Sequence, residues 1–367
     1  MRITFVSNFE LEDISGGWNG INANVFNELK KVCDIEYVGG INPPFNYLEK
    51  AVSKLRRVLH FKGSYSFFAE SRLNEINRQL TEKGIRGDQI LYFGATPWVK
   101  HRFSQPYSVY MDICFQDYIG LYIGEDQFDR KDISRIVEQE KFFLENARWI
   151  FWGSNWAHKQ AEKLYHTTFP NSVITSTGGN IPIPDCISSD PERKLLFISL
   201  DFEKKGGHIA YEAFLKVKEK FPDTSLSIIG QKPPGYVLET PGVNYVGLLN
   251  KKSPRDIAIL QYELNSSFFL IHPTKMDTMG AVIAEAGYYG LPSIAPDNFG
   301  IPDLIENGST GFMVPLPLSA EKFSVLILEM MDNMAKYLAM RKNVREFMVK
   351  ERSWTGIANK LVHTLSA

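Results

Sequence analysis

Two carboxylates in the second half of the sequence have the spacing of a ligand site. Residues 268–272 are an apolar run typical of a buried strand, and residues 280–290 have the pattern of a helix. Asp277 lies in the loop between them, and Glu285 lies inside the helix. The free N–H groups and the dipole at a helix N-terminus attract anions. Two interpretations remain open: both carboxylates face one binding crevice, or Asp277 only caps the helix and Glu285 is solvated.

Two lysines precede a second helix of the same kind. Lys204 and Lys205 follow the predicted strand 194–199 and come directly before the predicted helix 206–221, which a glycine pair opens. A cation beside a helix N-terminus is unfavourable unless an anion lies between them. An anion site is therefore a reasonable inference, but on this segment alone the alternative, a solvated basic loop, is favoured.

The first half contributes a glycine pair and one carboxylate. Gly16 and Gly17 follow the predicted strand 3–7, and glycines let a backbone approach a ligand closely. Their spacing matches neither the dinucleotide fingerprint nor a phosphate-binding Gly-Lys-Ser/Thr loop. Asp112 ends the predicted strand 107–111, at the edge where open α/β sheets present ligands. Without further context the favoured interpretation is that Asp112 caps a turn.

These residues are positioned by alternating short apolar runs and helical patterns, which are typical of parallel α/β folds. We expect strands at 3–7, 35–38, 89–93, 107–111, 149–152, 173–176, 194–199, 225–230, 244–246, 268–272 and 292–295. We expect helices at 20–32, 67–83, 132–146, 155–165, 206–221, 254–264, 280–290, 320–350 and 354–365.

The strand and helix series is interrupted once. Pro182, Pro184 and the cluster 188–191 break the pattern, so we place a lobe boundary there. The prediction is an α/β protein of two Rossmann-like, doubly wound lobes, residues 1–187 and 188–352. The C-terminal helix 353–367 is expected to rejoin the first lobe.

Composition excludes several classes of protein. The chain has 367 residues, 44% hydrophobic and 23% charged, which indicates a globular protein of two domains. A net charge of −1 argues against a nucleic-acid partner. Cys33, Cys114 and Cys186 have no metal-ligand spacing and favour a reducing compartment. We find no signal-peptide pattern and no apolar run of about 18 residues. The expectation is a soluble, cytoplasmic protein.

The segment 47–62 is a basic amphipathic run. Its apolar residues fall mostly on one helical face, and the rest is crowded by Lys50, Lys54, Arg56, Arg57 and Lys62. One interpretation is an ordinary helix with a solvated basic face. The other is peripheral contact with an anionic membrane surface that carries a lipid-linked acceptor.

The ordered motifs resemble the family-4 retaining glycosyltransferases of the GT-B fold. In the second half the matching residues are Pro273-Thr274, Gly280, Glu285-Ala286, 290–295, 300–305 and 308–314. Residues 110–112 and 201–207 resemble a subgroup with Y-x-D and D-F-x-K-K-G-G motifs, and residues 154–157 and 178–181 resemble its S-x-W-A and G-x-N-I motifs. The resemblance covers nearly the whole chain and is strongest in the second half.

The resemblance implies roles for the matched residues of the second lobe. Glu285 would bind the nucleotide ribose, Asp277 the donor sugar, and the backbone of residues 278–280 (Thr278, Met279 and Gly280) the diphosphate. Lys205 would bind the diphosphate too, with Lys204 as a weaker second cation. Two departures stand out: Asp277 replaces the usual glutamate, and Leu200 replaces a usual arginine.

The resemblance also implies roles in the first lobe, which would hold the acceptor. Gly16 and Gly17 would close over the donor phosphates, and Asp112 would stand near the reacting carbon, where many relatives have a histidine. His101 and the other histidines have no matched position and are interpreted as structural or surface residues.

The implied activity is a retaining transfer of a sugar from a nucleotide-diphosphate sugar to a glycan, a lipid-linked molecule or another hydroxyl acceptor. No metal or other cofactor is expected, and Asp112, Asp277 and Lys205 are the catalytic candidates. Surface polysaccharide or glycoconjugate synthesis at the inner face of a membrane fits this activity. The alternatives are a nucleotide-sugar epimerase or hydrolase of the same fold and a non-catalytic nucleotide-sugar-binding protein.

Overall fold

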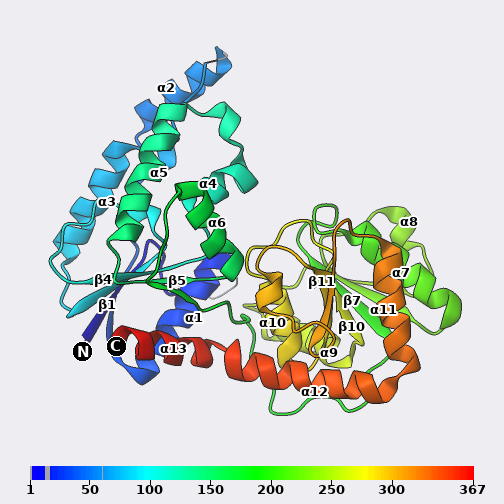
Figure 1. The fold of residues 1–367 in the computed structure, drawn as a ribbon. Helices are drawn as coiled ribbons and strands as arrows, with labels where there is room; N and C mark the ends of the chain where they lie inside the picture. The colour runs from blue at the N-terminus through cyan, green and yellow to red at the C-terminus, as the bar shows by residue number, and fades with distance from the viewer. Residues whose placement is uncertain (1, 13–16, 60) are drawn as a thin grey trace. The chain divides into compact units, whose positions relative to one another are not determined.

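The computed structural model describes residues 2–12, 17–59 and 61–367, and its contacts divide the chain into two units (Figure 1). Unit 1 consists mainly of Trp18–Thr175 and also takes the first strand and Ala358–Ala367. Unit 2 consists mainly of Ser176–Ile357. The contact boundary therefore precedes the lobe boundary placed at residue 187 from the sequence.

Unit 1 is built on a parallel sheet of six strands in the order β2-β1-β3-β4-β5-β6. The strands are β1 (Arg2–Val6), β2 (Asp34–Val38), β3 (Gln89–Phe93), β4 (Tyr107–Met111), β5 (Trp149–Trp152) and β6 (Ser172–Ile174). Every residue of β3 and β4 is buried. Strands covered on both faces read as continuous apolar runs, which is why the sequence locates them well.

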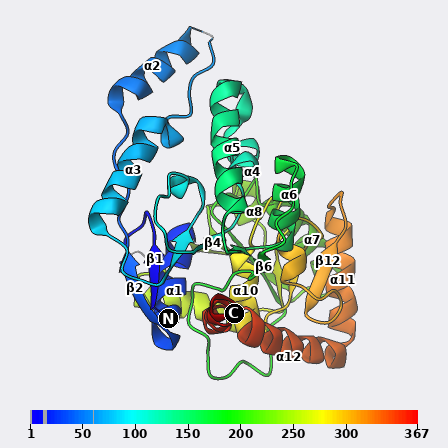
Figure 2. The same ribbon diagram turned by 60° about the vertical axis from the view of Figure 1, so that its left-hand side comes forward.

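The helices of unit 1 lie on both faces of this sheet, except α2, which lies away from it (Figure 2). They are α1 (Gly17–Val32), α2 (Tyr47–Val58), α3 (Glu70–Lys83), the short α4 (Phe115–Tyr118), α5 (Arg130–Glu145), α6 (Asn155–Tyr165) and the end of α13 (Trp354–Ser366). Polar caps fix two starts: Asp129 accepts from Lys131 N at 2.9 Å, and Ser154 accepts from Ala157 N at 3.1 Å. In both views α2 lies at the tip of the unit, far from the sheet.

Unit 2 repeats the architecture with the strand order β12-β11-β10-β7-β8-β9, again with parallel pairs. The strands are β7 (Lys194–Ser199), β8 (Ser225–Gly230), β9 (Val243–Gly247), β10 (Phe269–Ile271), β11 (Ser293–Pro296) and β12 (Gly311–Val314). The helices are α7 (Gly207–Lys220), α8 (Gly235–Leu238), α9 (Pro254–Ser266), α10 (Ala281–Tyr288), α11 (Ala320–Asp332) and α12 (Met334–Glu351).

Two doubly wound parallel sheets confirm the predicted fold class. The prediction of one helix over 320–350 is wrong, because the chain breaks at Asn333, whose side chain accepts from Lys336 N and caps a new helix. Strand β12 was missed because it is short and opens on a glycine. Within the described ranges, no helix is long and apolar enough to cross a membrane.

Candidate functional site

In unit 2, Asp277 lies at the centre of a network just after β10. Its Oδ2 lies 3.2 Å from Lys205 Nζ and accepts a hydrogen bond from His272 Nε2 at 3.0 Å. Its Oδ1 accepts from the backbone N–H groups of Met279 and Gly280, at 3.3 and 2.7 Å. The lysine is tied to the same loop by a second bond, 2.7 Å from Nζ to the Met276 carbonyl. One carboxylate thus joins β10, the start of α7 and the start of α10.

The environment of Asp277 strongly favours its ionised form. Burial by itself raises the pKa of the carboxyl, but the hydrogen bond and charge of His272, the charge of Lys205 and the Gly280 N–H outweigh it. The net effect holds the pKa of Asp277 well below its usual range. Asp277 is therefore a fixed negative charge at any pH near neutrality.

Of the two interpretations that the spacing left open for Asp277, the capping role is confirmed, and a binding crevice shared with Glu285 stays a prediction. The carboxylate does cap the turn before α10, and it also faces the cation Lys205. The backbone N–H groups of Met279 and Gly280, expected to hold a diphosphate, already donate to Asp277 Oδ1. A phosphate at these groups has to compete with that carboxylate. The side chains of Thr278 and Met279 are buried.

Glycine is required where the lysine loop approaches the loop after β10. Gly206 has φ of +77°, and a Cβ there would lie 2.2 Å from the Pro273 carbonyl oxygen. A side chain at this position would push the loops apart and move Lys205 from Asp277. Lys204 is placed differently: its Nζ lies 3.3 Å from Asp201, and its side chain is 85% exposed. The structure brings Lys205, and not Lys204, to the Asp277 network.

Glu285 is buried within α10 and is not solvated, so the solvated interpretation is wrong. Its side chain is 5% exposed, and its Oε1 accepts from Lys251 Nζ at 2.5 Å and from Asn180 N at 2.9 Å. Gly179 makes room for it, since a Cβ there would lie 2.7 Å from Glu285 Cγ. Lys251, in the loop between β9 and α9, was missed because it belongs to no motif.

His272 was also missed, because the histidines were interpreted as structural or surface residues. It is 2% exposed, and its Nδ1 has no hydrogen-bond partner among the described residues. Since Nε2 donates to the Asp277 carboxylate, this imidazole fixes the carboxylate orientation. The position of His272 at the end of β10, directly before Pro273, could have identified it from the sequence as a candidate site residue.

In unit 1, Asp112 follows β4 and lines a pocket of mainly aromatic walls. Burial raises the pKa of Asp112 to about 6, and the hydrogen bond from Ile113 N opposes the rise only in part. Gly17 begins α1 with φ of 58° and is exposed, whereas Gly16 lies outside the described residues.

A buried carboxylate, Glu140, holds two residues of the pocket wall in place. Glu140 on α5 accepts from Phe115 N at 2.7 Å, from the Tyr165 hydroxyl at 2.8 Å and from Thr96 Oγ1. Thr96 and Phe115 both line the pocket. Burial raises the pKa of Glu140, and its three donors compensate that cost in part. Glu140 therefore shapes the pocket without entering it.

Residues that could hold a metal ion are not grouped in the part of the chain that the structure describes: no three His, Cys, Asp or Glu side chains converge there. The chemical groups that do converge are a lysine, a histidine and a carboxylate beside a helix start in unit 2. The lysine beside the helix start suits an anion, and the carboxylate can accept hydrogen bonds from hydroxyl groups.

Solved structures that are built from two α/β units of this kind define the fold. Sucrose-phosphate synthase from Thermosynechococcus elongatus has a TM-score of 0.69 at 16% identity, covering 100% of this chain and 98% of that one. Anabaena HepE in complex with UDP has a TM-score of 0.66 at 16% identity, covering 100% of both chains. WaaG, a glycosyltransferase involved in lipopolysaccharide biosynthesis, has a TM-score of 0.64 at 14% identity, again over 100% of both. The chain has the GT-B fold.

The sequence comparisons specify the class within that fold. Residues 187–347, which include Lys205, Asp277 and Glu285, match the family model of Glycosyl transferases group 1. Spore coat protein SA of Bacillus subtilis (strain 168) is 26% identical over 179 residues, or 46% of this chain. That match spans about half of the relative, 47% of its length. Residues 187–347 are therefore similar to a glycosyltransferase domain, which supports the predicted enzyme class.

Proposed function

We propose that this protein is a retaining glycosyltransferase that uses a nucleotide-diphosphate sugar. The observation that carries the proposal is the Lys205–Asp277 pair, 3.2 Å apart at the start of α10, within the segment that matches the glycosyltransferase model. A lysine and a helix N-terminus together attract a departing diphosphate. An adjacent carboxylate accepts hydrogen bonds from sugar hydroxyls.

The donor is held by a division of labour between two carboxylates. Glu285 binds the ribose hydroxyls, with Lys251 and Asn180 N fixing the carboxylate from one side. Asp277 binds hydroxyls of the donor sugar. Structures of HepE contain UDP and UDP-glucose, so UDP-sugars are the first donors to test.

Charge on the leaving group is met by the protein itself, without a metal ion. The bond between the anomeric carbon and the diphosphate oxygen breaks, and a bond to the acceptor oxygen forms on the same face. The acceptor proton passes to the leaving phosphate. Lys205 and the N–H groups at α10 stabilise the charge that develops on that phosphate. Lys204 stays a second-cation candidate and requires a reorientation away from Asp201.

The acceptor is assigned to unit 1, where Asp112 lies near the reacting carbon. The exposed apolar face of α2 supports a membrane-bound acceptor: Leu48 is 79% exposed, Val52 58%, and Phe61 just beyond the helix 63%. Cations of the same segment, Lys50, Lys54 and Lys62, complement anionic lipid. We place the enzyme at the inner face of a membrane, in polysaccharide or glycoconjugate synthesis. Its three free thiols fit a reducing compartment.

A donor screen followed by a transfer assay tests the proposal. Thermal shift with a panel of nucleotide sugars is expected to show specific stabilisation by one donor. Transfer of its sugar to a glycan or lipid-linked acceptor should then proceed in excess EDTA. Nucleotide release without any acceptor indicates the hydrolase or epimerase alternative, and donor binding without turnover indicates a non-catalytic protein. Loss of transfer in EDTA, restored by Mg²⁺ or Mn²⁺, contradicts the metal-independent mechanism.

A further inference from the structure

Unit 1 contains a pocket that is suited to one face of a sugar ring. It has a volume of about 290 Å³, near the lower end of small-molecule sites. Trp18 and Phe93 stack at 4.3 Å between ring centroids and form an aromatic wall, and Phe115 forms another part of the lining. Asp112 and Thr96 bring polar groups to the same space. Flat aromatic surface with a few polar groups is typical of ligand sites that must orient a molecule.

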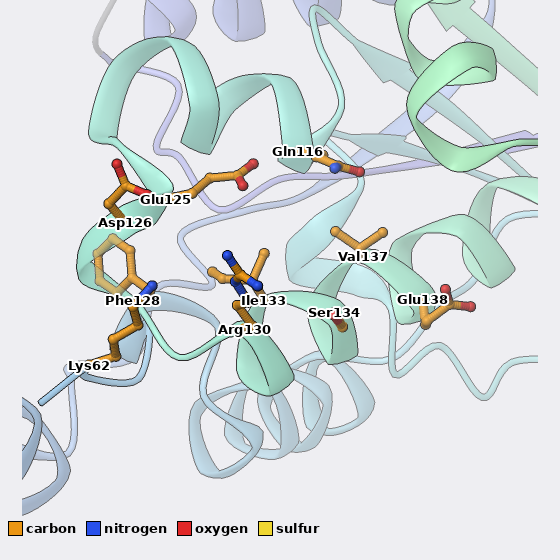
Figure 3. A pocket seen from close by; sticks show the side chains of 10 residues that line it. All are labelled: Lys62, Gln116, Glu125, Asp126, Phe128, Arg130, Ile133, Ser134, Val137 and Glu138. Atoms are coloured by element: carbon orange, nitrogen blue, oxygen red, sulfur yellow. The ribbon is translucent and has the colours of Figure 1, made fainter.

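A second pocket of about 370 Å³ lies beside α5 (Figure 3). Phe128, Ile133 and Val137 give it an apolar floor. Around them lie side chains of both signs, with Arg130 near the centre of the view and Glu125 extending across it towards Gln116. Carboxylates, amides and guanidinium groups donate to or accept from hydroxyl groups in several directions. This lining suits a neutral polyhydroxylated molecule better than an anion.

The two pockets share a wall. Tyr65 of the first pocket meets Phe128 of the second edge to face, with centroids 5.1 Å apart. Helix α4 contributes to both pockets: Phe115 lines the aromatic pocket, and the next residue, Gln116, lines the polar one. The pockets are therefore neighbours on one unit.

We propose that these pockets are adjacent subsites for a saccharide acceptor of at least two sugar rings. The reacting sugar lies in the aromatic pocket beside Asp112, and the neighbouring sugar lies in the polar pocket against Arg130 and Glu125. A hydrocarbon chain does not fit the second pocket, because it would desolvate charged side chains without replacing their hydrogen bonds. The inference rests on the proposed glycosyltransferase function and adds the class and minimum length of its acceptor.

Saccharide binding to the full chain tests this arrangement. The probes are methyl glucopyranoside, methyl maltoside and methyl cellobioside, followed by saturation-transfer NMR titration. At least one disaccharide is expected to bind about tenfold more tightly than the monosaccharide, the effect of one charge-assisted hydrogen bond. Arg130→Ala with Glu125→Gln should abolish that advantage. Trp18→Ala should weaken binding of all probes. Lys131→Ala removes an exposed cation next to Arg130 and is the matched control.

Three outcomes overturn the inference: no saccharide binds, the disaccharides have no advantage, or the advantage survives in the Arg130/Glu125 variant. UDP binding measured on the same preparations by thermal shift separates the two proposals. A protein that binds UDP but shows no disaccharide advantage keeps its proposed function and loses the two subsites. A protein that binds disaccharides but no nucleotide loses the proposed function.

Discussion

The two units use carboxylates in opposite ways. In unit 2, Asp277 and Glu285 are paired with Lys205 and Lys251, and the pKa of Asp277 is held far below its usual range. In unit 1, no salt bridge reaches Asp112 from the described residues, and burial raises its pKa to about 6. Ion pairing thus keeps the carboxylates of unit 2 ionised, whereas burial lets Asp112 in unit 1 change its protonation state with pH.

This difference indicates how each unit responds to change. A ligand of unit 2 exchanges with existing ion pairs, so the loss of one partner leaves the other charge uncompensated in a buried place. In unit 1 the charge of Asp112 depends on pH, because its carboxyl group changes protonation state near pH 6. Variants of the unit 2 carboxylates should therefore change ligand affinity and protein stability. Variants of Asp112 in unit 1 should change the pH dependence of the activity.

The largest effect is expected from Lys205→Ala. Loss of a charge-assisted contact to the leaving diphosphate costs about 1.5–3 kcal/mol, or roughly tenfold to two-hundredfold in kcat/KM. Lys204→Ala is the matched comparison, and we expect a change of less than about threefold because its exposed side chain pairs with Asp201. Steady-state kinetics with the donor found in the screen measure both. Equal losses in the two variants contradict the placement of Lys205 alone at the site.

Asp277→Asn should lower turnover about thirtyfold, within the range of one charged hydrogen bond, while UDP affinity stays within about threefold. Equal loss of UDP binding shows that the carboxylate binds ribose or phosphate instead.

The Asp277→Asn variant should also be less stable than wild type at pH 7. The folded pKa of Asp277 lies below its unfolded value near 3.9, so its stabilisation is present above that pH and is lost as pH falls through the folded pKa. Urea midpoints at pH 7 and pH 3 check this: the difference between wild type and variant should shrink at pH 3.

Glu285→Gln should weaken nucleotide binding about tenfold, because an amide replaces the carboxylate that accepts from the ribose. Calorimetric titration of UDP measures the loss. Lys251→Met keeps the carboxylate and removes its ammonium partner, so it should cost stability more than UDP affinity. If Lys251→Met abolishes UDP binding as completely as Glu285→Gln, the lysine itself binds the nucleotide.

Asp112 should give the pH–rate profile an acidic limb. If its carboxylate acts in ionised form, transfer falls about tenfold per pH unit below about 6, and Asp112→Asn removes both that limb and most of the rate. Its folded pKa is raised, so ionisation destabilises the fold as pH rises through about 6. Asp112→Asn should therefore be slightly more stable than wild type at pH 8. An unchanged pH profile removes Asp112 from the reaction.

The smallest effect is expected at the membrane surface. Lys54→Gln removes one exposed cation from α2, worth about 1 kcal/mol or roughly fivefold in binding to anionic vesicles. Flotation with phosphatidylserine-containing and neutral vesicles measures it, and Lys131→Gln on α5 is the matched control. Leu48→Ser with Val52→Ser tests the apolar face. Wild-type protein that floats with neither vesicle contradicts membrane contact.

The sequence by itself determined most of the strands and most of the helices. Strands β3, β4, β5, β7 and β8 have the predicted bounds, because strands buried on both faces are rich in apolar residues along most of their length. It also identified Lys205, Asp277 and Glu285 as candidates, because these residues stand in ordered motifs at helix starts. The helix break at Asn333 is harder to predict from the sequence. An asparagine can stand inside a helix, and here it ends one helix because its side chain accepts a hydrogen bond from Lys336 N and caps the next helix.

Only the tertiary structure decided which charges meet. Lys204 and Lys205 are neighbours in sequence, yet one faces Asp201 and the other Asp277, because Gly206 allows the loop to close against Pro273. Lys251 reaches Glu285 from a loop without a motif. The physical reason is that helix and strand periodicity depends on residues that are close in the sequence. An ion pair or a pocket depends instead on how loops that are distant in the sequence are placed in space, and this placement determines which partner a side chain contacts.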